Sequence, residues 1–218
     1  MIALRTWLTL GGALALIPAV LMSSDYATLA ADHVEPPTRA DPTVDPIPDA
    51  AADLADIFAW HTPQSVVIMI TFAGPRAANL PPVYDRDVLY RINISNAGAS
   101  TDAEHQILVR FGFDGNAVGV QISGVPGTTG PIIGPVQTEL NKEGVRAIAG
   151  IFDDPFFFDS QGLKDTRATG TLSIRNTRDF FANGNDTMVI LEIPRASIMN
   201  GSNRLDIWSD TGRFGGQI

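Results

Sequence analysis

Apolar and polar residues alternate along much of the chain with the period of two that is typical of β-strands. The segment 87–95 places its apolar side chains on one face: Val88, Tyr90, Ile92 and Ile94. The segment 107–113 alternates in the same way, and turn-forming residues after Ser95 separate the two segments. The pattern therefore predicts an antiparallel hairpin made of these two strands.

Further strands are predicted on both sides of this hairpin. Residues 66–72 are apolar on both faces, which is typical of a strand in the middle of a covered sheet. The remaining predicted strands cover residues 118–122, 132–139, 145–151, 187–193 and 205–209. Many short strands separated by turns favour a mainly β fold, an antiparallel β-sandwich or open barrel with one or two short helices.

Two short helices are predicted beside these strands. Asp49 is a suitable N-cap for a helix from Ala50 to Trp60, which Pro63 would end. The apolar residues of this segment share one helical face: Leu54, Ile57 and Phe58. Residues 176–183 are predicted to form one or two helical turns.

The N-terminus has the pattern of a secretory signal peptide over residues 1–30. Arg5 precedes the apolar run 7–22, and the small residues Thr28 and Ala30 predict cleavage before Ala31. The alternative is an uncleaved anchor, but the run is shorter than the roughly 20 residues that a membrane-spanning helix needs. We therefore expect a periplasmic or secreted protein without a stable membrane span after cleavage.

The mature chain is predicted to have two parts. Residues 31–50 are rich in Pro and Asp, and we expect them to run extended over the surface. Residues 51–218 are predicted to form a single β-rich domain.

The composition excludes several classes of function. The chain has no cysteine, which excludes disulfides and a thiol nucleophile. It carries 15 Lys and Arg residues and 24 Asp and Glu residues, which gives a formal net charge of -9. The basic residues do not form a cluster in the sequence. We therefore expect no nucleic-acid partner.

One group of acidic residues and a histidine is a candidate divalent-cation site, for example for calcium. Its members are His33, Glu35, Asp53, Asp56, Asp153 and Asp154. Hard cations prefer several oxygen ligands, and two carboxylates three residues apart share one face of a helix. The alternative is that these residues cap or solvate local elements, and no EF-hand spacing is present. His33, third from the amine freed by cleavage, also suits a small copper-type chelate.

The run Phe156, Phe157 and Phe158 is a candidate partner-binding surface. Three consecutive aromatic residues cannot all point inward from one strand. Either a turn buries two of them and exposes the third, or the group docks on a partner.

A complete catalytic set is not apparent in the sequence. The only three histidines are His33, His61 and His105, and no Gly-x-Ser-x-Gly motif is present. We interpret His61 and His105 as ordinary surface or packing residues. The sequence therefore weighs against an enzyme without deciding the question.

Four sequence blocks resemble the uncharacterised bacterial domain-of-unknown-function family numbered 4331. The first carries Asp32, His33, Glu35 and Pro37, followed by Ala52, Asp53, Asp56 and Ala59. The other blocks are Asp87 to Ile94, Gly150 to Asp159 and Val189 to Pro194, with Trp208 after the last of them. The resemblance implies an exported β-rich protein and implies no particular reaction.

Three functions remain open on the sequence alone. The first is an exported β-sandwich that acts as a binding or structural module for an unknown ligand, with stabilisation by a divalent cation. The second is an extracellular metal-dependent enzyme that uses the His, Asp and Glu cluster. The third is an accessory subunit that docks on a protein partner.

Overall fold

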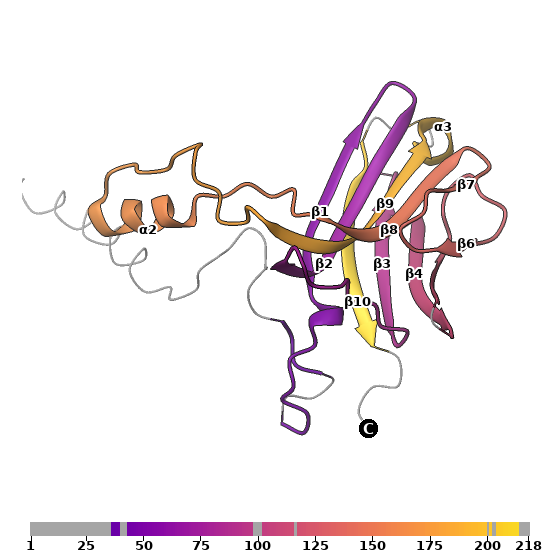
Figure 1. Ribbon diagram of the computed structural model, residues 1–218. Helices are drawn as coiled ribbons and strands as arrows, with labels where there is room; N and C mark the ends of the chain where they lie inside the picture. Colours follow the sequence, from indigo (N-terminus) through magenta and orange to yellow (C-terminus); the bar gives the residue numbers. More distant parts are fainter. Residues whose placement is uncertain are drawn as a thin grey trace, which may run out of the picture. The chain divides into compact units, whose positions relative to one another are not determined.

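Two antiparallel five-stranded sheets make up the domain in the computed structural model (Figure 1). The structure describes residues 36–39, 43–97, 102–115, 117–199, 201 and 204–213. The predicted signal peptide and the start of the mature chain lie outside these residues. The prediction of a mainly β fold, a β-sandwich with short helices, is confirmed.

The first sheet has the strand order β1-β2-β9-β8-β7. Its strands, in that order, are Leu54–His61, Ser65–Ala77, Gly184–Pro194, Val145–Asp153 and Leu140–Lys142. The second sheet has the order β10-β3-β4-β5-β6. Its strands, in that order, are Asp206–Arg213, Val88–Ser95, His105–Asp114, Ala117–Ser123 and Ile132–Pro135.

The predicted hairpin is the pair β3 and β4. Tyr90 lies opposite Val109 and Ile92 lies opposite Ile107, so the apolar faces of the two strands coincide. These side chains are buried and belong to one hydrophobic core, to which both sheets contribute. Alternation in the sequence therefore identified the inward face of the second sheet.

Strand β2 is central in the first sheet, as its two apolar faces predict. It pairs with β1 on one side and β9 on the other. Ile68 and Ile70 are fully buried in the core, and Val67 and Met69 on the opposite face are also buried.

The predicted helix from Ala50 to Trp60 is wrong. Only the 3-10 turn η1, Ala50–Ala52, is helical, and the following residues form β1. Bulky residues such as Phe58 and Trp60 favour an extended chain, and β1 gains a full antiparallel partner in β2 through the turn at Pro63. Pairing with the apolar strand outweighs the weak local preference for a helix.

The predicted helical turns at 176–183 are also wrong, because this segment forms turns without a helix. The Asp179 carboxylate accepts hydrogen bonds from the backbone N–H groups of Phe181 and Phe158, at 3.0 and 3.4 Å. An Asp that bonds the backbone two residues ahead stabilises a turn in place of a helix.

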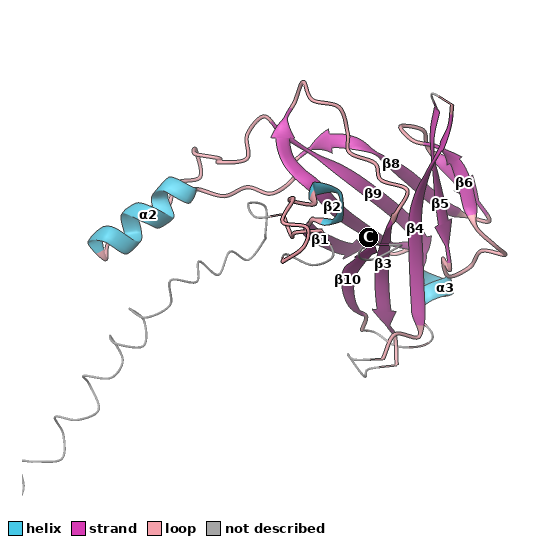
Figure 2. Cartoon of the chain, turned by 90° about the horizontal axis from the view of Figure 1, so that it is seen from below, coloured by secondary structure: helices cyan, strands magenta, loops and turns pink. Residues whose placement is uncertain are grey.

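Two α-helices occur elsewhere, at positions that the apolar pattern did not indicate (Figure 2). Helix α2, Ser160–Thr169, lies between β8 and β9, and α3, Arg195–Ile198, follows β9 directly. The side chain of Asp159 caps α2 by accepting from the Gly162 N–H, and Gly170 ends it with φ of 68°. Within the described residues no helix has both the length and the apolarity that a membrane crossing requires.

Candidate functional site

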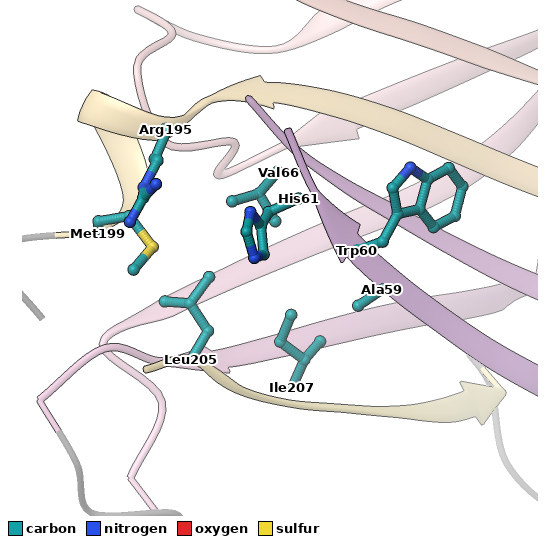
Figure 3. Close-up of a pocket in the computed structure, with 8 residues that line it drawn as sticks. All are labelled: Ala59, Trp60, His61, Val66, Arg195, Met199, Leu205 and Ile207. Atoms are coloured by element: carbon teal, nitrogen blue, oxygen red, sulfur yellow. The ribbon is translucent and has the colours of Figure 1, made fainter. Parts of the chain in front are cut away.

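A pocket opens where the edge strands of the two sheets approach one another, β1 from the first sheet and β10 from the second. Its volume is about 210 Å³. Eight described residues line it (Figure 3): Ala59, Trp60, His61, Val66, Arg195, Met199, Leu205 and Ile207.

Strand β1 presents His61 to this pocket. His61 lies opposite Val66, and Ala59 lies opposite Ile68, both of which face the core from β2. Because side chains alternate along a strand, Ala59 and His61 share the inner side, and the ring of Trp60 points away from Arg195 (Figure 3).

The turn between β1 and β2 is held by a short hydrogen-bond network. The Thr62 hydroxyl oxygen accepts from the N–H groups of Gln64 and Ser65 at 3.2 and 2.9 Å. The Ser65 hydroxyl donates to Glu192 of β9 at 2.9 Å. This network fixes the end of β1 that carries His61.

Helix α3 places Arg195 on the other side of the pocket. The Arg195 N–H donates to the Gln64 carbonyl at 2.8 Å, which joins α3 to the β1–β2 turn. At the end of the helix, the buried side chain of Asn96 donates to the Ile198 carbonyl at 2.7 Å. Both ends of α3 are therefore anchored, and the guanidinium of Arg195 extends from a fixed backbone.

The floor of the pocket is apolar. Ile207 of β10 lies opposite Ile94 of β3, and Leu205 precedes this strand. Ile207, Leu205 and Met199 all pack against the hydrophobic core. A ligand on this floor would exchange water for aliphatic side chains.

The polar groups of the described lining are basic. Arg195 and His61 are its only titratable side chains, and no carboxylate lines it. Within the described part of the chain, neither side chain forms a hydrogen bond or an ion pair. By contrast, Arg91, Arg146 and Arg178 each reach a carboxylate. The pocket thus combines an apolar floor with two basic groups that have no partner in the described part of the chain.

The predicted cation ligands lie at one end of the first sheet but on different strands. Asp53 is buried between η1 and β1, and its carbonyl accepts from the Ala73 N–H at 3.0 Å. Asp56 lies on β1, where its N–H donates to the Thr71 hydroxyl at 2.9 Å. Asp53 precedes β1, and an irregularity in the pairing with β2 lies between Leu54 and Ile57, so the helical argument for this pair does not apply.

Asp153 and Asp154 lie at the end of β8, on the far side of β2 and β9. Asp153 lies opposite Asn185, and the Asp154 carboxylate accepts from the Phe156 N–H at 2.8 Å. Three strand spacings, about 14 Å, separate the backbones of β1 and β8. Within the described residues, no three His, Asp or Glu side chains are placed to hold one metal ion. His33 and Glu35 lie outside the described residues.

The run Phe156, Phe157 and Phe158 follows β8 and is not part of a strand. Phe156 and Phe158 are half-buried and stack at a ring-centroid distance of 6.0 Å, and Phe156 also meets Phe181 edge-on at 5.4 Å. Phe157 is 51% exposed. The turn therefore partly shields two rings and exposes the middle one, and the partner-binding role of this run stays a prediction.

A separate cluster of charged side chains connects the segment before η1 with β10 and has a structural role. Its members are Asp49, Asp85 and Arg213. The Arg213 guanidinium donates to Asp49 and, at 2.9 Å, to Asp85. Burial alone would raise the pKa of Asp85, but the Asp87 N–H and the Arg213 guanidinium outweigh burial and lower it. The hydrogen bond to Asp49 and, after it, the one to Asp85 outweigh burial and raise the pKa of Arg213 above its ordinary value. The Arg213 charge is therefore paired with two carboxylates of the protein itself, unlike the charge of Arg195 among the described residues.

Sequence reasoning did not find the pocket. It interpreted His61 as an ordinary surface or packing residue and did not consider Arg195. The two residues are far apart in the sequence, and only the pairing of β1, β2 and β9 brings them together. No local motif carries that information.

No protein-family model, no curated protein and no solved structure matches this chain. The resemblance to the domain-of-unknown-function family therefore stays a prediction.

Proposed function

We propose that this chain is an exported binding module that takes a small ligand in the pocket between β1 and β10. Export is suggested by the apolar N-terminal run that follows Arg5. The observation that carries the binding function is the apolar cavity bordered by two basic side chains that have no partner among the described residues. Apolar pockets with a few convergent polar groups are typical ligand sites.

Binding is a better account of this pocket than catalysis. General acid–base or nucleophilic chemistry needs a base with an orienting partner and a nucleophile or second acid. Within the described lining, His61 has neither a carboxylate nor a hydroxyl beside it. The lining instead has the composition of a receptor, with apolar area for the ligand body and donors for one end.

The test is a fragment screen by ligand-observed NMR on the mature protein. Ala59→Phe fills the pocket, and Ala77→Phe, at an exposed position near the end of β2, is the matched control. We expect fragments that bind the native protein and the control but not Ala59→Phe. Binding that Ala59→Phe leaves intact would contradict the proposal.

A second candidate function, docking on a protein partner, is favoured by the segment between β8 and β9. Four large apolar side chains of this segment are exposed: Phe157, Leu172, Ile174 and Phe180. Exposed apolar groups gathered in one segment are typical of interaction surfaces. Native sizing from the source cells tests this: a heavier complex should be lost with Phe157→Ser and retained with Leu80→Ser, which changes an exposed residue outside the segment.

A further inference from the structure

We infer that the ligand of this pocket is a small organic carboxylate with an aliphatic or aromatic body, bound with its carboxylate between Arg195 and His61. This inference rests on the proposed function and names the chemical class of its ligand. Three features of the pocket support it: the charge of its polar groups, the apolarity of its floor and its size.

The charge of the polar groups selects an anion. A guanidinium is a planar fork of N–H donors that matches a carboxylate in two parallel hydrogen bonds. The chain has 24 acidic residues against 15 basic ones, yet no acidic side chain is among the described residues that line the pocket with Arg195. A positively charged ligand would meet two basic groups and no carboxylate there.

The position of His61 completes the anion site. Figure 3 shows the ring nitrogens of His61 and the guanidinium of Arg195 on either side of the space above Leu205. A carboxylate in this space would accept from the guanidinium on one side and from an imidazole N–H on the other. Neither donor has a hydrogen bond or ion pair to another described residue that it would first have to break.

The floor selects an apolar body. Leu205, Ile207 and Met199 offer aliphatic and thioether surface, which favours methylene groups or an aromatic ring. Inorganic phosphate or another fully hydrated anion would leave this surface without a partner. The ligand therefore needs both a charged end and an apolar end.

The size of the pocket limits the body to one ring or a short chain. A volume of 210 Å³ corresponds to about seven molecules of liquid water. This is below the usual range for drug-sized ligands, about 300 to 1,000 Å³. A long acyl chain would extend out of the pocket into solvent, so we expect short arylalkanoates or branched alkanoates.

Isothermal titration calorimetry on the mature protein tests the inference with three probes. They share one carbon skeleton and differ in the charge of the end group. These are 3-phenylpropanoate, the neutral 3-phenylpropanamide and the cationic 3-phenylpropylammonium. We expect the carboxylate to bind at least about tenfold more tightly than the amide, as a charge-assisted hydrogen bond predicts. The ammonium probe should show no binding.

Three variants test whether the preference for the carboxylate over the amide depends on Arg195. Arg195→Gln should reduce the affinity for the carboxylate to that for the amide, and Arg195→Lys should retain part of the preference because it keeps the charge but loses the fork. Arg204→Gln is the control: it removes a nearby positive charge that is already paired with Asp206, and it should leave the preference unchanged. Circular dichroism confirms that each variant is folded.

The outcomes separate the inference from the proposed function. Equal binding of acid and amide, or a preference that survives Arg195→Gln, would overturn the inference and leave the binding function standing. A further result would also overturn the inference and leave the binding function standing. In that result none of the three probes binds, while the fragment screen finds ligands whose binding Ala59→Phe abolishes. If the screen also finds no ligand, the binding function fails together with the inference.

Discussion

Arg213, near the end of β10, donates from Nε and Nη2 to the two carboxylate oxygens of Asp49, which precedes η1. Both distances are 2.5 Å, and both side chains are largely buried, with exposed fractions of 11% and 6%. This pair ties the segment before β1 to the last strand of the second sheet. It therefore links the start and the end of the described domain.

The first prediction concerns this pair. Arg213→Gln leaves the Asp49 carboxylate buried without its guanidinium, and removing one partner of a buried ion pair costs about 3 kcal/mol. We expect that loss in the free energy of unfolding, measured by urea denaturation. Arg86→Gln, which breaks the exposed pair with Asp87, should change it by less than about 1 kcal/mol. Equal losses in the two variants would show that the Asp49 pair has no special role.

The second prediction concerns acid stability of the segment around α2. Burial alone would raise the pKa of Asp159, but the N–H groups of Gly162 and Arg175 and the guanidinium of Arg178 outweigh it and lower the pKa. A carboxyl whose pKa is lower in the folded state stabilises the fold fully above its unfolded pKa, about 3.9. That stabilisation is lost as the pH falls through the lower, folded value.

We therefore expect the amide hydrogens of α2 to lose protection from exchange below about pH 4, where the unfolded-state carboxyl protonates. Asp159→Asn should weaken this protection already at neutral pH and remove its dependence on acid. Asp114→Asn, at an exposed strand end, is the control and should behave like the native protein. Protection in Asp159→Asn that matches the native protein at neutral pH would refute the role of this carboxylate.

The third prediction concerns Gly124, which follows β5 with φ of 74°. A Cβ atom at this position would overlap the backbone carbonyl oxygen of Gln106, and the positive φ adds strain for any L-residue. Gly170, at the end of α2, has a similar φ of 68° but open space around it. Gly124→Ala should therefore destabilise the domain by more than Gly170→Ala, for which we expect about 1 kcal/mol. Thermal unfolding of both variants measures the difference, and the reverse order would contradict it.

The fourth prediction concerns the cation site that the sequence suggested. Because β2 and β9 lie between β1, which follows Asp53, and β8, which ends at Asp153, we expect that the two carboxylates do not share one ion. Asp153→Asn should therefore leave unchanged any shift in melting temperature that a chelator causes in the native protein. A chelator effect that disappears both in Asp153→Asn and in Asp53→Asn would restore the shared site. Elemental analysis of the mature protein measures bound metal directly.

The fold was predictable where side chains alternate and one face is buried. The hairpin of β3 and β4 follows from such alternation, and the central position of β2 follows from its two apolar faces. The segment 50–60 was mispredicted because its alanines and spaced apolar residues also fit a helix, and only the partner strand β2 decides between the two. Helix α2 was missed because it has little apolar surface; its signals are the cap residues Asp159 and Gly170.

The candidate site was not predictable, for a different reason. His61 ends one edge strand and Arg195 begins helix α3 after β9, and neither belongs to a local motif. Their proximity depends on strand order, which a period-two pattern does not specify. Residues that did form a local pattern, such as Asp53 and Asp56, depended on a helix that does not exist.

The most direct test of the account is the location of the bound carboxylate. We would record methyl and amide NMR spectra of the mature protein during titration with 3-phenylpropanoate. The account predicts shifts concentrated at His61, Leu205 and Ile207, with Leu172 of the segment between β8 and β9 unchanged. Shifts confined to that segment, or spectra that do not change up to the solubility limit of the probe, would contradict it.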